Sequence, residues 1–215
     1  MLHPSQGPMI RPLLTVPALA IAAVAAPLPA LAQQAGDLAL VQRHLQAIST
    51  LTADFTQADR NGKVLTGVLT LKQPGKIRFQ YQKGVPILIV ADGGALVFID
   101  YSVRQVQRWP IKNSPLGVLL DPGRDIARYA HVVGGGDDRL VSVEASDTKH
   151  PEYGRITLVF ARNRTGPEGL MLQGWVALDS QNNRTTVRLA NQRYGVPVSD
   201  GTFRWNDPRK GGGRN

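Results

Sequence analysis

Few residues in this chain have the types and spacing that catalysis or metal binding requires. Beyond residue 32 the histidines are His44, His131 and His150, and their spacing matches no HExxH or similar metal-binding motif. The sequence contains no GxSxG nucleophile elbow, no P-loop and no GxGxxG followed by a helix. We expect His44 to be a solvated side chain on the exposed side of a helix rather than a catalytic base.

The carboxylates add little to this picture. Asp137 and Asp138 in the stretch GGGDDR could bind calcium, although the stretch is typical of a loop. Asp92, Asp100 and Asp121 lie beside predicted turns, where an aspartate usually caps backbone amides. Two carboxylates from distant strands can still converge in an active site. The missing motifs therefore favour binding over catalysis, and we expect no cofactor and no metal.

The N-terminus predicts a signal peptide over residues 1–32. Arg11 precedes the apolar run LLTVPALAIAAVAA, and Ala30 and Ala32 form a small-x-small cleavage site. The apolar run of about 14 residues is shorter than the ~20 that a membrane-spanning helix needs. We therefore expect an exported protein, with one domain over residues 33–207 and a disordered tail over 208–215.

The mature chain must be held together by its core, because it has no cysteine for disulfides. Its formal charge is strongly positive, +9 for the whole chain. Such a charge fits nucleic acid, an anionic membrane surface or acidic partners, or simply keeps the protein soluble. Export argues against nucleic acid, and an aromatic content of 6% offers no platform for stacking bases.

The elements that must position any site are one helix and many strands. Leu38, Val41, Leu45 and Ile48 recur at helical spacing, with Asp37 near the predicted helix start to favour the helix dipole. From residue 51 onward, short runs such as KIRFQYQ alternate apolar and polar residues between turn signals, which predicts an antiparallel meander. The alternation resumes after residue 139 with LVSVEAS, GRITLVFAR, GLMLQGWVALDS and RTTVRLANQRYG.

A short second helix interrupts the strands. Ser114 can cap it and Pro115 suits its first position. The apolar residues that follow are Leu116, Val118, Leu119 and Leu120. Asp121-Pro122 then ends the helix, and a further helical turn is predicted in DIARYAH.

The number of strands raises a packing problem. About ten strands must bury their apolar face against another sheet, inside a barrel or under helices. The few predicted helices can cover only a small part of such a sheet. Two solutions remain open: a sandwich, or a curled sheet that encloses a space lined by residues such as Phe79, Phe98 and Trp175.

Several segments in order resemble the LolA family of outer-membrane lipoprotein carriers. They are LTADFTQ, VLTGVLTLKQPGKIRFQY, ILIVADGGALVFIDYSVRQV and SPLGVLL, and the resemblance runs from about Leu38 to Asp125 and more weakly to Phe203. It implies a mainly β fold with some α: a single unclosed antiparallel β-barrel, covered by a lid of short helices over an apolar cavity.

The resemblance also implies a function. Family members take acylated lipoproteins from an inner-membrane ATP-driven transporter, cross the periplasm with them, and deliver them to the outer membrane, often through an acceptor lipoprotein. We therefore expect a monomeric periplasmic carrier that is not an enzyme. The alternative is a carrier or sensor of other envelope lipids on the same scaffold, of the envelope-stress regulator type.

The same resemblance suggests site residues. The expected cavity lining is Ile77, Phe79, Tyr81, Leu88, Val90, Leu96 and Phe98, although these residues would equally suit an ordinary sandwich core. The expected lid helix carries Leu116, Val118, Leu119 and Leu120. Many members place an arginine before the proline of the LKQPG segment, where it hydrogen-bonds to the lid. Here that latch position is Gln73, whose bond would lack charge assistance and be weaker.

Overall fold

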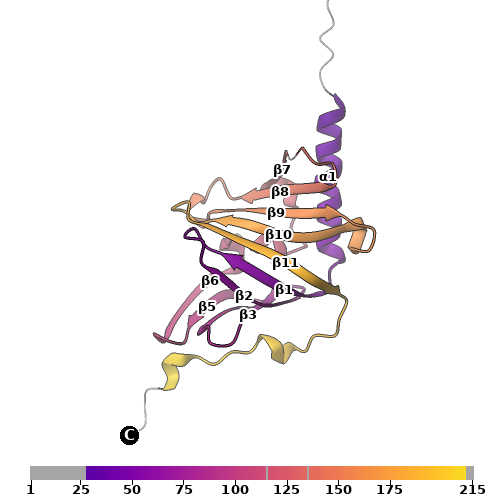
Figure 1. Cartoon of the computed structure of the whole chain (residues 1–215). Coiled ribbons are helices and arrows are strands. Elements are labelled where there is room, and N and C mark those ends of the chain that lie inside the picture. The colour runs from indigo at the N-terminus through magenta and orange to yellow at the C-terminus, as the bar shows by residue number, and fades with distance from the viewer. Residues whose placement is uncertain (1–27, 115, 135, 212–215) are drawn as a thin grey trace, which may run out of the picture.

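The computed structural model describes residues 28–114, 116–134 and 136–211. Most of the predicted signal peptide, Pro115 and the last four residues of the predicted tail lie outside these ranges. The fold is a single antiparallel sheet of 11 strands in the order β6-β5-β4-β3-β2-β1-β11-β10-β9-β8-β7 (Figure 1). The strands are β1 (Thr50–Ala58), β2 (Val64–Lys72), β3 (Lys76–Tyr81), β4 (Ile87–Asp92), β5 (Ala95–Asp100), β6 (Gln105–Pro110), β7 (Ala130–Val133), β8 (Leu140–Ser146), β9 (Arg155–Arg162), β10 (Leu170–Leu178) and β11 (Arg184–Tyr194).

The helices are fewer and mostly short. They are α1 (Leu28–Ala47), α2 (Gly117–Leu120) and the 3-10 turns η1 (Ile111–Asn113), η2 (Ile126–Arg128), η3 (Pro151–Tyr153), η4 (Pro167–Gly169), η5 (Asp200–Phe203) and η6 (Pro208–Gly211). The turn η6 lies at the start of the tail that was predicted to be disordered. Among the described residues, no helix is both long enough and apolar enough to cross a membrane.

The first helix begins earlier than predicted. It starts at Leu28, so Asp37 lies in its middle rather than in its first turn. The preceding stretch LPALAQQA is rich in alanine, leucine and glutamine, which favour helix, and this explains the extension. Asp37 instead accepts a hydrogen bond from Arg162 at the end of β9.

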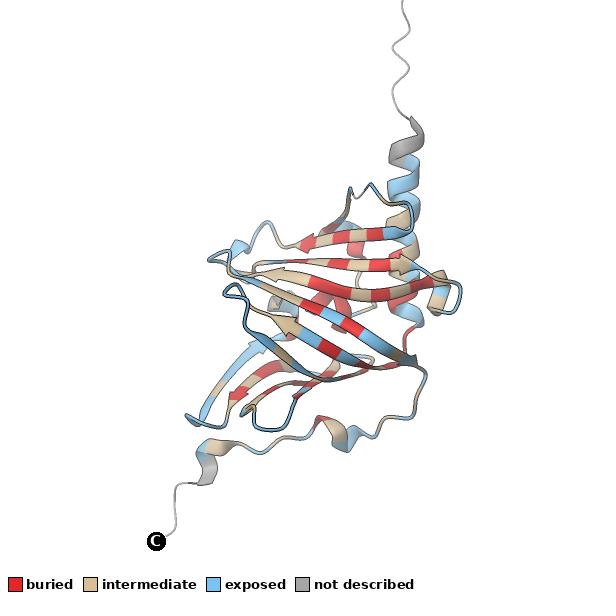
Figure 2. Ribbon diagram, viewed as in Figure 1, coloured by how far each residue is buried: buried red, intermediate tan, exposed pale blue. Residues whose placement is uncertain are grey.

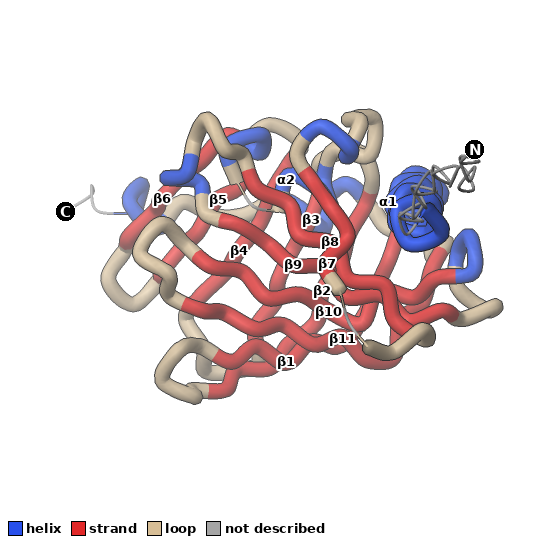
Figure 3. The backbone as a smooth tube through the Cα atoms, turned by 90° about the horizontal axis from the view of Figure 1, so that it is seen from above, coloured by secondary structure: helices blue, strands red, loops and turns tan. Residues whose placement is uncertain are grey.

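The sheet curls and remains open, as the resemblance implied. Its end strands β6 and β7 do not pair with each other. Phe79 on β3 nevertheless meets Trp175 on β10 edge to face, with ring centroids 6.0 Å apart. Because β2, β1 and β11 separate these strands in the sheet, this contact must cross the concave side. The view from above shows the curl, with α1 end-on at one side (Figure 3).

The main core lies on the concave face. Buried and less buried positions alternate along the strands (Figure 2), as expected for a sheet with two different faces. Val41 and Leu45 of α1 join this core together with Ile48, which follows the helix, and α1 lies against β7, η2 and η4. Close packing requires Gly67 on β2, because a Cβ there would lie 2.2 Å from Gln80 O and 2.7 Å from the Phe55 ring.

A second apolar cluster lies on the convex face. Leu88, Val90, Val97 and Ile99 on β4 and β5 pack with Phe203, and all five are at most 3% exposed. Phe203 belongs to the chain that follows β11, which runs past the sheet as the yellow segment in Figure 1. Both faces of β4 and β5 are therefore covered.

Candidate functional site

The short helix α2 is buried in the concave side of the sheet. Ser114 Oγ accepts a hydrogen bond of 3.2 Å from Leu116 N. However, α2 begins only at Gly117 with Leu116 as its N-cap and without a side-chain cap, so the prediction that Ser114 caps this helix was wrong. Val118, Leu119 and Leu120 are at most 3% exposed and belong to the main core. Leu116 is half-buried against the same core. All four predicted lid residues thus face one apolar interior.

The turn between β2 and β3, residues 73–75, holds the end of α2. Gln73 Nε2 donates a hydrogen bond to Leu119 O, and Gly75 N donates to Leu120 O at 2.8 Å. The last carbonyls of a helix have no partners within the helix, so these two donors satisfy groups that would otherwise be buried unpaired. The structure therefore brings Gln73 to the helix that the resemblance assigned as its partner. We call residues 73–75 the latch turn.

Aromatic side chains fill the interior beside α2. Phe55 meets Phe79 and Tyr81 edge to face, at centroid distances of 5.4 and 5.2 Å, and Phe79 continues to Trp175. The Tyr81 hydroxyl donates to Gln57 Oε1 at 2.8 Å. Burial raises the pKa of Tyr81 to about 12, so this hydroxyl stays neutral. The cluster is apolar and offers no acid or base.

An open apolar cleft lies at one end of this interior. It has a volume of about 410 Å³, within the usual range for small-molecule sites. We call it the mouth cleft. It is lined by Leu96, Trp109, Pro110, Ser114, Tyr153, Ala177, Leu178 and Thr185, and also by the polar residues Glu152, Asp179 and Asn183. It therefore lies between the β5–β6 edge and the β10–β11 hairpin, beside the segment that leads into α2. Trp109 is 41% exposed, an unusual position for such a large apolar side chain.

The seven expected cavity residues divide between the two faces. Ile77, Phe79, Tyr81 and Leu96 belong to the concave core. Phe98 is half-buried on the same side as Leu96, opposite Ile89 in the ladder.

The prediction that Leu88 and Val90 line the cavity was wrong, because both belong to the convex cluster. On β4 the concave positions are Ile87, Ile89 and Ala91 instead. Both sets on this strand are apolar because the strand is covered on both faces, so alternation alone could not identify the inner set.

The expectation for His44 was also wrong. Its side chain is fully buried, and its Nδ1 lies 2.7 Å from Pro167 O, so Nδ1 carries the proton that this carbonyl accepts. Its ring meets Phe160 and Tyr194 edge to face. Burial lowers the pKa of His44, against smaller opposing effects of the Pro167 carbonyl and Glu168. His44 therefore anchors α1 to the sheet in its neutral form.

Of the three aspartates predicted to cap turns, Asp92 and Asp100 do so through their side chains, whereas Asp121 takes part through its backbone N–H, which donates to Gly117 O at 3.0 Å. Asp92 accepts a hydrogen bond from Gly94 N, and Asp100 accepts from both the N–H and the hydroxyl of Ser102. Asp137, considered for calcium, pairs with Arg139 at 2.7 Å. Among the residues that the structure describes, no three acidic, histidine or cysteine side chains gather as a metal site would require.

Sequence reasoning missed several parts of the site. Trp109, Tyr153 and Leu178 come from three separate elements and meet only in the mouth cleft. The exposed tryptophan on an end strand was the one available clue, since RQVQRWPI already marked β6 as a polar strand with one large apolar residue.

Together, these features define a class of protein: an unclosed half-barrel whose apolar interior is covered by a short, latched helix. The chain belongs to the LolA family, because the family model described as "Outer membrane lipoprotein carrier protein LolA" matches residues 46–206.

Relatives match over most of their length. An outer-membrane lipoprotein carrier protein from Chromobacterium violaceum is 30% identical, with 90% of this chain and 94% of that protein covered. One from Dechloromonas aromatica is 27% identical, with 84% of this chain and 88% of that protein covered. Among solved structures, a LolA superfamily protein from Nitrosomonas europaea aligns with a TM-score of 0.43 at 10% identity, covering 80% of this chain and 98% of that one.

Proposed function

We propose that this protein is a periplasmic carrier that binds the acyl chains of lipoproteins and transports them from the inner to the outer membrane. Cargo would occupy the space between the concave face and α2, and would enter through the mouth cleft. One observation carries the proposal: α2 is a four-residue helix buried in an apolar interior, yet a single turn supplies the donors to its final carbonyls. A cover fastened in this way can leave without unfolding the sheet.

The physical need for such a carrier is large. Transfer of one methylene from water to an apolar environment is worth ~0.8 kcal/mol, so a chain of about 16 carbons costs on the order of 12 kcal/mol in water. Acyl chains therefore do not leave a membrane unaided. A protein interior that shields them removes most of this penalty during transit.

Delivery sets the opposite requirement. In the closed form α2 and the aromatic cluster occupy the concave side, so cargo must displace them. The energy of closing the empty protein then opposes cargo binding, which limits affinity and favours release at the destination. The mouth cleft, beside the segment that leads into α2, is a part of this interior that is already open.

The proposal includes partners that the family resemblance implies. Loading would involve an inner-membrane ATP-driven lipoprotein-releasing transporter, and unloading would involve an acceptor lipoprotein of the outer membrane. We infer a monomer that works without a cofactor and without catalysis. Carriage of other envelope lipids is the alternative, and the cargo decides between the two.

The test is to identify that cargo. The full chain, with its signal peptide, is expressed in a Gram-negative host and purified from the periplasm without detergent, and bound molecules are identified by mass spectrometry. Triacylated lipoproteins are the expected result. Phospholipid without lipoprotein would replace the proposal by the alternative, and the absence of any apolar ligand would overturn both.

A further inference from the structure

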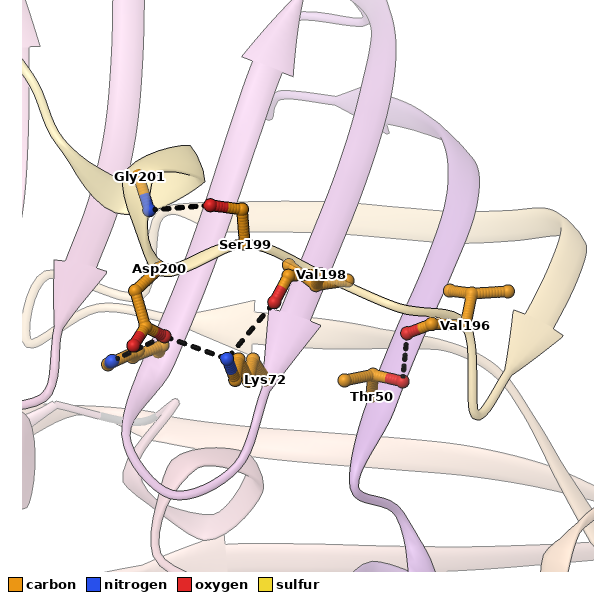
Figure 4. Close-up of polar contacts among 8 residues, drawn as sticks. Thr50, Lys72, Val196, Val198, Ser199, Asp200 and Gly201 are labelled. Carbon is orange, nitrogen blue, oxygen red and sulfur yellow. Dashed lines mark hydrogen bonds and ion pairs between the residues drawn. The ribbon is translucent and has the colours of Figure 1, made fainter.

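The chain after β11 forms a strap, residues 196–205, along the convex face. Thr50 Oγ1 donates to Val196 O at 2.8 Å, near the start of the strap (Figure 4). Arg78 donates to Thr202 O and Arg204 O, at 3.2 and 3.0 Å. Phe203 is buried in the convex cluster. The strap is therefore fixed at both ends and in the middle.

Asp200 connects the strap to both strands that carry the latch turn. Lys72 ends β2 and Lys76 begins β3, and the two residues are directly opposite in the ladder. Both ammonium groups contact Asp200 Oδ1, at 2.8 Å from Lys72 and 2.9 Å from Lys76. Lys72 Nζ also donates to Val198 O at 3.0 Å (Figure 4). The hydrogen bonds from Lys72 and Lys76 lower the pKa of Asp200 to about 2, so it is ionised at neutral pH.

These contacts lie on the other side of the sheet from the lid. Leu71 and Ile77 belong to the concave core, so their neighbours Lys72 and Lys76 point to the convex side. The latch turn lies between the two lysines and holds the final carbonyls of α2. The Asp200 carboxylate therefore bonds to both ends of the latch turn on the convex side, while the turn itself hydrogen-bonds to α2 on the concave side.

We propose that Asp200 is a positioning residue for the lid. By drawing Lys72 and Lys76 together, it fixes the latch turn in the geometry in which Gln73 and Gly75 reach the carbonyls of α2. Release of Asp200 loosens this turn and raises the fraction of molecules with an open lid. The inference rests on the proposed function only in taking α2 as the movable cover.

A purely structural role for the strap is the competing reading. Phe203 buries apolar surface, and that contribution stabilises the convex face whether or not the latch turn is affected. The Asp200 contacts contribute through charge, because the carboxylate is exposed and bonded to two cations. Substitution of Asp200 alone thus separates the two readings, since it leaves Phe203 in place.

The experiment measures lid opening directly through the reactivity of an introduced thiol. The chain has no cysteine, so Val118→Cys in α2 provides a single reporter, buried when the lid is closed. Val143→Cys, fully buried on β8, reports opening of the core away from the lid. Under conditions where labelling follows the open population, the rate at each site gives the corresponding opening equilibrium.

With Asp200→Asn added, we expect the Val118→Cys reporter to label about two- to five-fold faster at low salt, the range for a small exposed charge network. The difference should shrink as salt screens the ion pairs. The Val143→Cys rate should not change. Asp137→Asn is the matched control, because Asp137 is also a partly exposed carboxylate that pairs with a cation, Arg139, yet is distant from the latch turn in sequence. It should leave both rates unchanged.

Two outcomes would overturn the proposal: an unchanged Val118→Cys rate, or an equal increase at both reporters, which would mean that Asp200 stabilises the whole fold. A second comparison uses Lys72→Gln with Lys76→Gln, which should reproduce the effect of Asp200→Asn. All three changes together should then give no further increase. Labelling requires no cargo. The role of Asp200 can therefore be refuted without refuting the proposed carrier function, and the reverse also holds.

Discussion

At the scale of single residues, the side-chain hydrogen bond of the latch turn comes from the neutral amide of Gln73. Gln73 Nε2 reaches Leu119 O, while Gln73 Oε1 has no partner among the described residues and is buried. An amide at this position donates without charge, and half of its hydrogen-bonding capacity is left unused. The lid of this protein should therefore be held less tightly than one bonded by a guanidinium, whose hydrogen bonds are roughly twice as strong.

Gln73→Ala should open the lid more often. Loss of one neutral hydrogen bond changes stability by about 1 kcal/mol, which corresponds to a roughly five-fold change in the opening equilibrium. Thiol labelling of Val118→Cys measures this change, and Gln107→Ala, an exposed position on β6, serves as the control. Equal labelling rates in the two variants would show that the Gln73 amide does not hold the lid closed.

Gln73→Arg should act in the opposite direction. A guanidinium can donate to Leu119 O with charge assistance and can also reach a second carbonyl, so the closed form becomes more favourable. Cargo exchange between the carrier and acceptor vesicles should then slow by several-fold. Unchanged exchange kinetics would show that this position does not control opening.

His44 makes stability depend on pH. Its pKa is lowered in the folded protein, chiefly by burial, so above about pH 6.5 it is neutral in both folded and unfolded chains and has no effect. Below that value the unfolded chain binds a proton that the folded chain resists. The unfolding free energy should therefore fall as pH decreases, by at most about 1.4 kcal/mol per pH unit.

Denaturant unfolding between pH 5 and 7.5 tests this expectation, because this range brackets the ordinary histidine pKa. His44→Gln should flatten the curve in that range. His131→Gln, at an exposed histidine, should leave the slope of the parent protein intact. A slope that survives the loss of His44 would assign the pH dependence to other groups.

At the scale of elements, the alternation of apolar and polar residues predicted where the strands lie, but it predicted which side chains face the interior for only some of them. On β3 the apolar set Ile77, Phe79 and Tyr81 faces inward, because its neighbours are polar and only one face could be apolar. On β4 every residue from Ile87 to Ala91 is apolar. The choice of face there depends on the strap, which follows in sequence more than a hundred residues later, and local pattern carries no information about it.

The buried helix α2 provides the next test. Leu119→Glu places a carboxylate in the apolar interior, where an unpaired charge is strongly disfavoured, so the lid should remain outside. Cargo transfer should then be abolished, while the circular dichroism spectrum and the cooperative unfolding of the sheet persist. Leu140→Glu, at a position that is 40% exposed on β8, should transfer cargo normally. Normal transfer by the Leu119 variant would refute the lid assignment.

Packing inside the curled sheet predicts an effect at β2. Gly67→Ala would place a methyl group against Gln80 O and the Phe55 ring, at 2.2 and 2.7 Å before relaxation. The strand must shift, and overpacking of this kind costs about 1–3 kcal/mol in unfolding free energy. Gly36→Ala in α1 meets no atom within 4 Å and should instead stabilise, by up to about 1 kcal/mol. Equal stability of the two variants would contradict the close packing at Gly67.

At the scale of the whole molecule, one sheet serves two functions. Its concave face carries the lid and the mouth cleft, and its convex face is covered by the strap over β4 and β5. The family resemblance predicted the lid over the concave face but not the mouth cleft, since the segments that carry it include β1 to β5 and α2. The strap could not be foreseen, because VPVSDGTFRW has the composition of a loop and shows its apolar anchor only when Phe203 is seen against the convex cluster.

Phe203→Ala should release the strap without opening the sheet. The side chain is 2% exposed against Leu88, Val90, Val97 and Ile99, and removal of a buried phenylalanine costs about 3–5 kcal/mol when the site cannot collapse. The strap contains no strand, so it should detach before the sheet unfolds. Cleavage by trypsin at Arg204 should become much faster, whereas cleavage at Arg188 within β11 should not change.

Detachment would also expose a contiguous apolar surface on β4 and β5, and such surfaces promote association. We therefore expect the Phe203 variant to sediment as larger species at concentrations where the parent protein does not. Val103→Ala, at a residue that is 67% exposed, is the control and should change neither proteolysis nor sedimentation. If the Phe203 variant stayed resistant to trypsin at Arg204, the strap would have to be held mainly by its ion pairs and backbone hydrogen bonds. Asp200→Asn, rather than Phe203→Ala, would then be the change that frees it.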